Sequence, residues 1–236
     1  MTAAARIGAE NPALQPPRLR LIAACGMIAF MPARPAPRPD PRLPSRRAPG
    51  FDARRAVIRE QAAALFAAQG YQRASLVGLA RSLGITANGV TNYYFTKEDL
   101  LYAVLDAHLL ALLAAVERAD DETLAPRPRL DALAGAYLAF IAGPGANGQR
   151  LLREAARFLP EARGQDLRTR ERWLLALFRE ALAAAAPKRA AALLAPLTLS
   201  LFAMLNEAPR WHRPEGALTP AAYAALAVRA VLAAAR

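Results

Sequence analysis

FDARRAVIREQAAALFAAQGYQRASLVGLARSLGITANGVTNYYFTKEDL, residues 51–100, decides the fold of this chain. Apolar residues between Val57 and Phe66 recur at helical spacing, which predicts a first helix with Asp52 as its N-terminal cap. Gly70 is of the residue type that commonly ends a helix, because glycine adopts a positive φ without a steric cost. The stretch therefore begins with one amphipathic helix and a defined end.

The following residues predict two more short helices and then a longer one. Ser75 is suited to cap the second helix and Thr86 the third, with Gly84 as the break between them. Thr96, followed three residues later by a carboxylate, predicts a capping box at the start of the fourth helix. Two short helices joined by a glycine turn favour a helix-turn-helix, whose second helix enters the major groove of DNA.

This order of residues resembles the DNA-binding domain of the TetR family of bacterial transcriptional repressors. The matching positions are Leu65, Phe66, Gly70, Tyr71, Ser75, Leu79, Ala80, Leu83, Gly84, Ile85, Thr86, Tyr93, Tyr94, Thr96, Lys97, Glu98 and Leu100. The resemblance implies an all-α fold, in which an N-terminal three-helix helix-turn-helix domain precedes a C-terminal helical domain for ligand binding and dimerisation. Asn88 and Thr91 depart from the family, which mostly has a glycine and an aromatic residue there, so no operator sequence carries over.

Eight residues in and around the predicted third helix are candidate DNA contacts. They are Ser75, Thr86, Ala87, Asn88, Thr91, Asn92, Tyr93 and Lys97. Asparagine reads adenine through paired hydrogen bonds, and threonine offers a base its hydroxyl or its methyl group. Hydroxyl groups and a lysine suit phosphate oxygens, which fix the register of a protein on DNA. Simpler interpretations remain open, with Ser75 and Thr86 as caps only and Asn88 as a plain surface residue; Tyr94 is expected in the core.

Charge and composition divide the chain into three expected parts. Residues 1–50 form a Pro/Arg/Ala-rich extension expected to be disordered, 51–98 the helix-turn-helix domain, and 99–236 the effector-binding and dimerisation domain. Residues 1–55 hold ten arginines against three acidic residues, out of a net charge of +12 for the chain. Such an arm adds salt-dependent affinity for phosphate, or it is a tail without a role.

The beginning of the chain permits two further hypotheses. The apolar run at residues 19–31 is too short to span a bilayer, although with its upstream arginines it faintly resembles a secretory signal. A DNA-binding domain would be separated from its DNA by export, so we expect a bacterial cytoplasmic protein that joins the nucleoid when it binds. The alternative is that translation begins at Met31.

Enzyme motifs are not found in the sequence. The two histidines, His108 and His212, lack carboxylates at metal-binding spacing, and no nucleophile elbow, phosphate loop or dinucleotide fingerprint is present. Cys25 is the only cysteine, which excludes a disulfide within one chain. We therefore expect no catalytic residue, metal or cofactor. The remaining alternative is a basic amphipathic helical protein that binds a membrane surface or acts as a scaffold.

Beyond the helix-turn-helix the chain is expected to be helical near 97–118, 128–142, 147–158, 166–186, 189–206 and 219–235. Glycine and proline mark the breaks, including a break from Pro209 to Pro214. The last two helices are apolar nearly all round, which predicts that they are buried. The resemblance implies that they pair with their copies in a homodimer, which matches a palindromic double-stranded DNA operator.

The resemblance also implies a small-molecule effector pocket in the C-terminal domain. Candidate lining residues are His108, Leu112, Tyr137, Phe140, Arg153, Phe158 and Trp173, with Phe178 and Phe202 beside them. Aromatic residues at this spacing are also typical of a plain core, and His108 is expected to be partly exposed. Arg153 and Arg157, one helical turn apart, are suited to an anionic effector or to solvent. The sequence as a whole predicts a repressor released from its operator by a small molecule.

Overall fold

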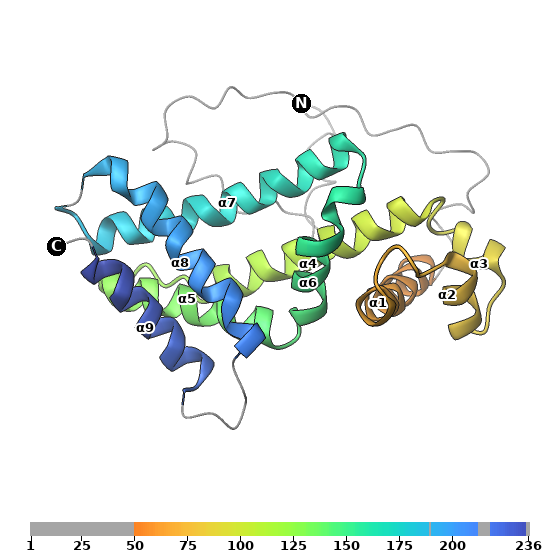
Figure 1. Cartoon of the computed structure of the whole chain (residues 1–236), viewed down its shortest axis with the longest axis horizontal. Coiled ribbons are helices and arrows are strands. Elements are labelled where there is room, and N and C mark those ends of the chain that lie inside the picture. Colours follow the sequence, from red (N-terminus) through yellow and green to blue (C-terminus); the bar gives the residue numbers. More distant parts are fainter. Residues whose placement is uncertain (1–49, 189, 212–217, 235–236) are drawn as a thin grey trace, which may run out of the picture. The chain divides into compact units, whose positions relative to one another are not determined.

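The computed structural model describes residues 50–188, 190–211 and 218–234, and over these ranges it contains helices and no strand (Figure 1). The fold is all-α, with an N-terminal helix-turn-helix domain followed by a C-terminal helical domain. The expectations for the arginine-rich extension, for the apolar run and for a start at Met31 concern residues 1–49, which lie outside the described residues.

Four helices carry the N-terminal part. They are α1 (Phe51–Gln69), α2 (Leu76–Ser82), α3 (Ala87–Thr91) and α4 (Lys97–Arg118). Gly70 and Gly84 have φ angles of 80° and 66°, so both breaks use a backbone conformation that other residues rarely adopt. We call α1, α2, α3 and the segment that leads into α4, residues 51–98, the head.

The prediction of Asp52 as an N-terminal cap is wrong, and two further details of the head come from the structure alone. The first helix begins at Phe51, so Asp52 lies in its first turn and does not cap it. The negative charge of Asp52 there interacts favourably with the helix dipole. Val57 is 50% exposed, because the buried side of α1 is the one that carries Ile58 and Phe66. The third helix ends at Thr91 and stops short of Tyr93.

Tyr94 lies in the core of the head, as expected. Its ring is buried, and its hydroxyl donates a hydrogen bond to the Arg55 carbonyl oxygen at 3.1 Å. The Arg55 guanidinium carbon lies 5.1 Å from the centroid of the same ring. Val90 of α3 is also fully buried, which leaves the other sides of this short helix to face outward.

The C-terminal part adds five α-helices and one 3₁₀ turn to α4. They are α5 (Pro126–Ala142), α6 (Ala146–Ala155), η3 (Ala156–Phe158), α7 (Glu161–Ala185), α8 (Ala191–Trp211) and α9 (Pro220–Ala233). Helix α5 contacts α4, α7, α8 and α9, while α6 contacts both α4 and α1 of the head (Figure 1). Helix α5 is thus the centre of this domain, and α6 connects it to the head.

Two helix bounds differ from the sequence prediction by several residues. Helix α7 begins at Glu161, directly after Pro160, and not near residue 166. The helix starts immediately after the proline even though its first turns are polar. Helix α8 continues through Pro209 to Trp211 and does not end near residue 206. Pro196 also lies inside α8.

By length and composition alone, α4 and the Ala191–Arg210 part of α8 pass as membrane-crossing helices among the described residues. Half of the apolar window of α4 is buried in the protein, as in the core helix of a globular fold, whereas 28% of the window of α8 is buried. Helix α8 therefore keeps an exposed apolar side.

Candidate nucleic-acid interface

The helix-turn-helix is built on side-chain caps. The Ser75 Oγ accepts a hydrogen bond from the Gly78 backbone N–H at 3.0 Å, and the Thr86 Oγ1 accepts one from the Gly89 N–H at 3.1 Å. These bonds satisfy amides that the first turns of α2 and α3 leave without a partner. Each hydroxyl still has its own hydrogen to donate, so capping is compatible with a bond to a phosphate oxygen.

The face of α3 opposite the buried Val90 is polar. Asn88 and Asn92 are exposed there, and Ala87 and Thr91 are half-buried. The Thr91 Oγ1 donates to the Asn88 carbonyl oxygen at 3.2 Å. Asn88 on α3 and Asn92 at its C-terminal cap therefore present exposed amide groups, which can form paired hydrogen bonds with base edges.

Tyr93 lies just after this helix. Its ring is half-buried and tilted against that of Phe51, with the centroids 4.8 Å apart, so the start of α1 supports its position. Sequence reasoning gave no role to Phe95, whose side chain is 71% exposed beside the Thr96 cap. An isolated aromatic residue outside a periodic stretch carries no signal for burial or exposure.

Lys97 has internal partners at the start of α4. Its Nζ donates to the Gln72 carbonyl oxygen at 3.2 Å and lies 4.3 Å from the centroid of the Tyr71 ring. A carbonyl and an aromatic face offset the unfavourable helix dipole at this end. Burial lowers the pKa of Lys97, and the neighbouring Glu98 opposes that shift. The ammonium group retains further hydrogens for a phosphate.

Tyr71 contacts Lys97, Glu98 and Phe158. Its hydroxyl donates to the Glu98 Oε1 at 3.3 Å, and burial, followed by the charge of Glu98, raises the pKa of the tyrosine to about 12. Its ring stacks on Phe158 of η3 at 5.3 Å between centroids. Phe158 thus contacts the head.

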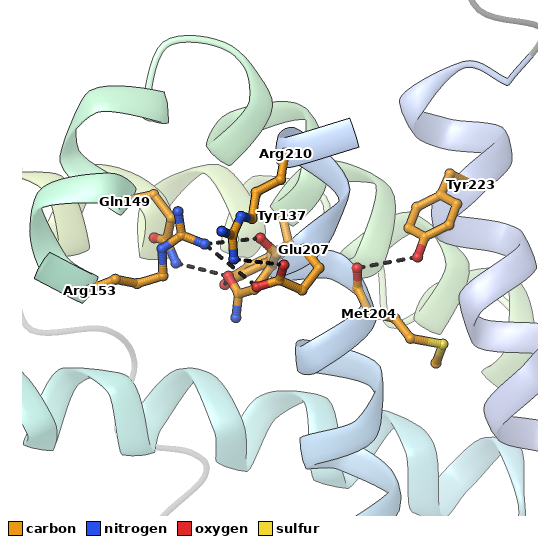
Figure 2. A network of polar contacts seen from close by, with 8 residues as sticks. Tyr137, Gln149, Arg153, Met204, Glu207, Arg210 and Tyr223 are labelled. Atoms are coloured by element: carbon orange, nitrogen blue, oxygen red, sulfur yellow. Dashed lines mark hydrogen bonds and ion pairs between the residues drawn. The ribbon is translucent and has the colours of Figure 1, made fainter. Parts of the chain in front are cut away.

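Side chains from four helices of the C-terminal domain meet in a polar junction around Asn206. Figure 2 shows two of these side chains, Tyr137 on α5 and Gln149 on α6. The Asn206 Oδ1 on α8 accepts from the Tyr137 hydroxyl on α5 at 2.8 Å and from the Gln149 Nε2 on α6 at 2.9 Å. The Gln149 Oε1 lies 2.9 Å from the His108 Nε2 on α4, so His108 is the donor of that bond. We call His108, Tyr137, Gln149 and Asn206 the polar junction.

The prediction that His108 is partly exposed is wrong. The side chain is 8% exposed, and burial lowers its pKa, although the bond to Gln149 acts in the opposite direction. Burial also raises the pKa of Tyr137 far above its usual range, so its hydroxyl stays a donor. Sequence reasoning missed Gln149 and Asn206. Asn206 is a single amide at the end of an apolar stretch, whereas Gln149 stands between polar neighbours and nothing in the sequence distinguishes it.

The other predicted effector residues fall into separate places. Phe140 lies against His108, with ring centroids 5.6 Å apart, and Leu112 is fully buried in the core. Phe158 contacts Tyr71 instead, and Trp173 is 44% exposed on α7. The structure therefore brings His108, Tyr137 and Phe140 together and places Phe158 and Trp173 apart from them.

Arg153 and Arg157 do not share a partner. Arg153 Nη1 donates to the Asn206 carbonyl oxygen at 3.4 Å and lies 3.9 Å from the Glu207 Oε1, at the edge of the polar junction (Figure 2). Arg157 lies over the Phe158 ring, 5.0 Å from its centroid, and lines a cleft of about 380 Å³ formed with residues 69–73. The arrangement does not bring the two guanidinium groups onto one anion.

Two family models match the chain. The model described as "Bacterial regulatory proteins, tetR family" matches residues 58–104, and the model "Tetracyclin repressor-like, C-terminal domain" matches residues 123–235. The two matched ranges together exceed half of the chain. No protein among the curated sequences matches it significantly.

Solved structures agree with the family models. A TetR-family transcriptional regulator from Bordetella parapertussis is 28% identical, with a TM-score of 0.68 over 75% of this chain and 93% of its own. A tetR-family regulatory protein from Rhodococcus RHA1 is 25% identical, with a TM-score of 0.67 over 76% and 95%. AibR, solved with isovaleryl coenzyme A and operator DNA, is 20% identical, with a TM-score of 0.66 over 74% and 96%.

The fold and the capped helix-turn-helix define a DNA-binding transcriptional regulator. The chain belongs to the TetR family.

Proposed function

We propose that this protein is a homodimeric repressor that binds a palindromic operator through α3 and leaves it when a small molecule binds the C-terminal domain. The observation that carries the proposal is the polar outer face of α3, where Asn88 and Asn92 are exposed opposite the buried Val90. The amides of Asn88 and Asn92, together with Ala87 and Thr91, are assigned to base edges. Ser75, Thr86, Tyr93 and Lys97 are assigned to phosphates.

Selection of bound duplexes from a random DNA pool at near-physiological salt tests the proposal. We expect a palindrome with two equivalent half-sites, because a two-fold dimer presents two identical heads. Folded protein that enriches no sequence, with and without candidate effectors, would contradict it. Binding to anionic vesicles without any preference among duplexes would support the alternative of a membrane-surface protein.

Two substitutions separate base reading from phosphate binding. Asn88→Ala is expected to relax the preference at one base position of each half-site, with a loss of about 1–3 kcal/mol on the preferred base. Lys97→Ala is expected to weaken binding to every duplex and to reduce the salt slope by about one per head. Fluorescence anisotropy on selected and scrambled duplexes measures both effects.

Lys188→Ala is the matched control for the charge, because Lys188 is the only other lysine and is exposed after α7. It should leave the affinity for both duplexes unchanged. Equal losses for Asn88→Ala and Lys97→Ala, with the sequence preference intact in both, would contradict the assignment of the two roles.

A second copy of this chain is the proposed partner for α8 and α9. Their surfaces include Leu193, Leu199 and Leu226, which are 46%, 57% and 42% exposed. Such side chains gain free energy when an apolar surface covers them. Sedimentation of the purified protein tests this interface, and a monomer at micromolar concentration would contradict it.

The proposed effector contacts are the polar junction and its neighbours Phe140 and Arg153. Support comes from four helices meeting at one set of hydrogen bonds, of which α4 leads to the head and α8 to the proposed dimer face. AibR, a structural neighbour, was solved with isovaleryl coenzyme A, so acyl-coenzyme A thioesters are the first compounds to test here. An effector must bind the form of the protein that releases DNA more tightly than the form that binds it. Release of the selected operator in an anisotropy assay identifies such a compound.

A further inference from the structure

Helices α4 and α7 are joined by three polar contacts in register. The residues on α4 are three and four positions apart, as are their partners on α7, so each set lies on one side of its helix. The pairs are Asp99 with Arg163, Tyr102 with Asp166, and Asp106 with Arg170. We call these three pairs the polar ladder.

The first pair of the polar ladder is tied to the start of α4. The Asp99 Oδ2 accepts from the Thr96 backbone N–H at 3.0 Å, which completes the capping box. The Asp99 Oδ1 pairs with the Arg163 guanidinium, whose central carbon also lies 5.0 Å from the centroid of the Tyr102 ring. One carboxylate therefore closes the cap of α4 and anchors it to α7.

The two ion pairs of the polar ladder are more sheltered from solvent than an ordinary surface ion pair, whereas the Tyr102–Asp166 contact is exposed. The Arg163 and Asp99 side chains are 35% and 25% exposed, and those of Arg170 and Asp106 are 26% and 23% exposed. The Arg168–Glu161 pair, which lies within α7, has 52% and 81% exposure. Partial burial reduces screening, so the ladder resists displacement of α4 from α7 more than an exposed pair does.

The segment between α3 and α4 is short. Helix α3 ends at Thr91 and α4 begins at Lys97, and Tyr94 in between is fixed in the core of the head. A rotation of the first turns of α4 therefore moves α3 with it. In the proposed dimer, two heads at a fixed separation read one operator. A rotation of α4 that displaces α3 should therefore weaken operator binding more than binding to random DNA.

We infer that Arg163 and Arg170 are positioning residues for operator binding, which act by holding the first turns of α4 against α7 through Asp99 and Asp106. This inference rests on the proposed function, because it requires that α3 reads the operator. It adds residues far from α3 in the sequence, on a helix of the C-terminal domain, to the determinants of specific binding.

The test compares arginine variants of one helix on the operator selected from the random pool. Arg163→Gln and Arg170→Gln should each weaken operator binding on the order of fivefold, with affinity for a scrambled duplex changed by less than twofold. Arg168→Gln removes the same charge from α7 without touching α4, so it should leave both affinities unchanged. Circular dichroism establishes that each variant is folded, and Arg163→Lys should recover part of the affinity.

Asp106→Asn breaks the same ladder but changes the net charge in the opposite direction from the arginine variants. It makes the protein more positive, so a role through long-range charge alone predicts tighter DNA binding, whereas a positioning role predicts weaker operator binding. Tighter operator binding by Asp106→Asn, or equal effects of Arg163→Gln and Arg168→Gln, would overturn the inference. Failure of the unmodified protein to select an operator would instead refute the proposed function, so the two failures are distinguishable.

Discussion

The head and the C-terminal domain begin their helices in different ways. In the head, Ser75, Thr86 and Thr96 each accept a backbone N–H at the start of α2, α3 and α4. In the C-terminal domain, α5, α6 and α7 have no side-chain cap, although Thr219 caps α9. Helices of seven and five residues, such as α2 and α3, are too short to be stable alone. Each capped backbone amide is therefore a large part of what stabilises them. The long helices instead draw their stability from packing along their length.

The largest expected effect tests packing in the C-terminal domain. A Cβ added at Gly148 on α6 would lie 2.4 Å from the His108 Nδ1 and 2.9 Å from the His108 Cβ. Gly148→Ala should therefore destabilise the protein by about 1–3 kcal/mol, because α6 must move away from α4. Guanidinium unfolding followed by circular dichroism, at a fixed protein concentration, measures this loss.

Gly135→Ala on α5 is the matched control. A Cβ there meets nothing within 4 Å, so the replacement should stabilise the helix by about 0.5–1 kcal/mol. If both glycine variants were stabilised equally, α6 would not depend on its close approach to α4.

The next effect tests the caps of the head. Thr86→Ala removes the acceptor for the Gly89 N–H and should cost about 1 kcal/mol of unfolding free energy. Ser82→Ala removes a hydroxyl of the same head that only donates to the Leu79 carbonyl oxygen at 2.8 Å, and it should change stability by less than about 0.5 kcal/mol. Denaturant midpoints of the two variants measure both losses of stability. A larger loss for Ser82→Ala than for Thr86→Ala would contradict the importance of the caps.

The same contrast explains what the sequence predicted. The caps at Ser75, Thr86 and Thr96 were found because each bond closes over three residues, and local chemistry determines it. The junction between Gln149 and Asn206 spans 57 residues, and no local pattern encodes such a contact. Only the start of α7 and the end of α8 differ from the sequence prediction by several residues, at Pro160 and at Pro209.

The smallest expected effect concerns pH. Burial holds the pKa of His108 below its usual 6.5, so the unfolded chain binds a proton more readily than the folded protein. The contribution of neutral His108 to the free energy of unfolding is therefore complete above pH 6.5. It decreases as the pH falls from there through the pKa of the folded protein. Unfolding free energies between pH 8 and pH 5 should fall more for the unmodified protein than for His108→Gln. Parallel curves would show that the junction tolerates a charged imidazole, and His212 is common to both proteins.

Helix α4 has a consequence for the construction of chimeric regulators. Helix α1 contacts α4, and Leu100, Leu101 and Val104 in the first two turns of α4 are buried. A head cut out after residue 98 would lose these side chains and expose the surface they cover. An exchange of DNA specificity between relatives must therefore transfer the opening turns of α4 with the head, and the recipient must supply matching partners on α7.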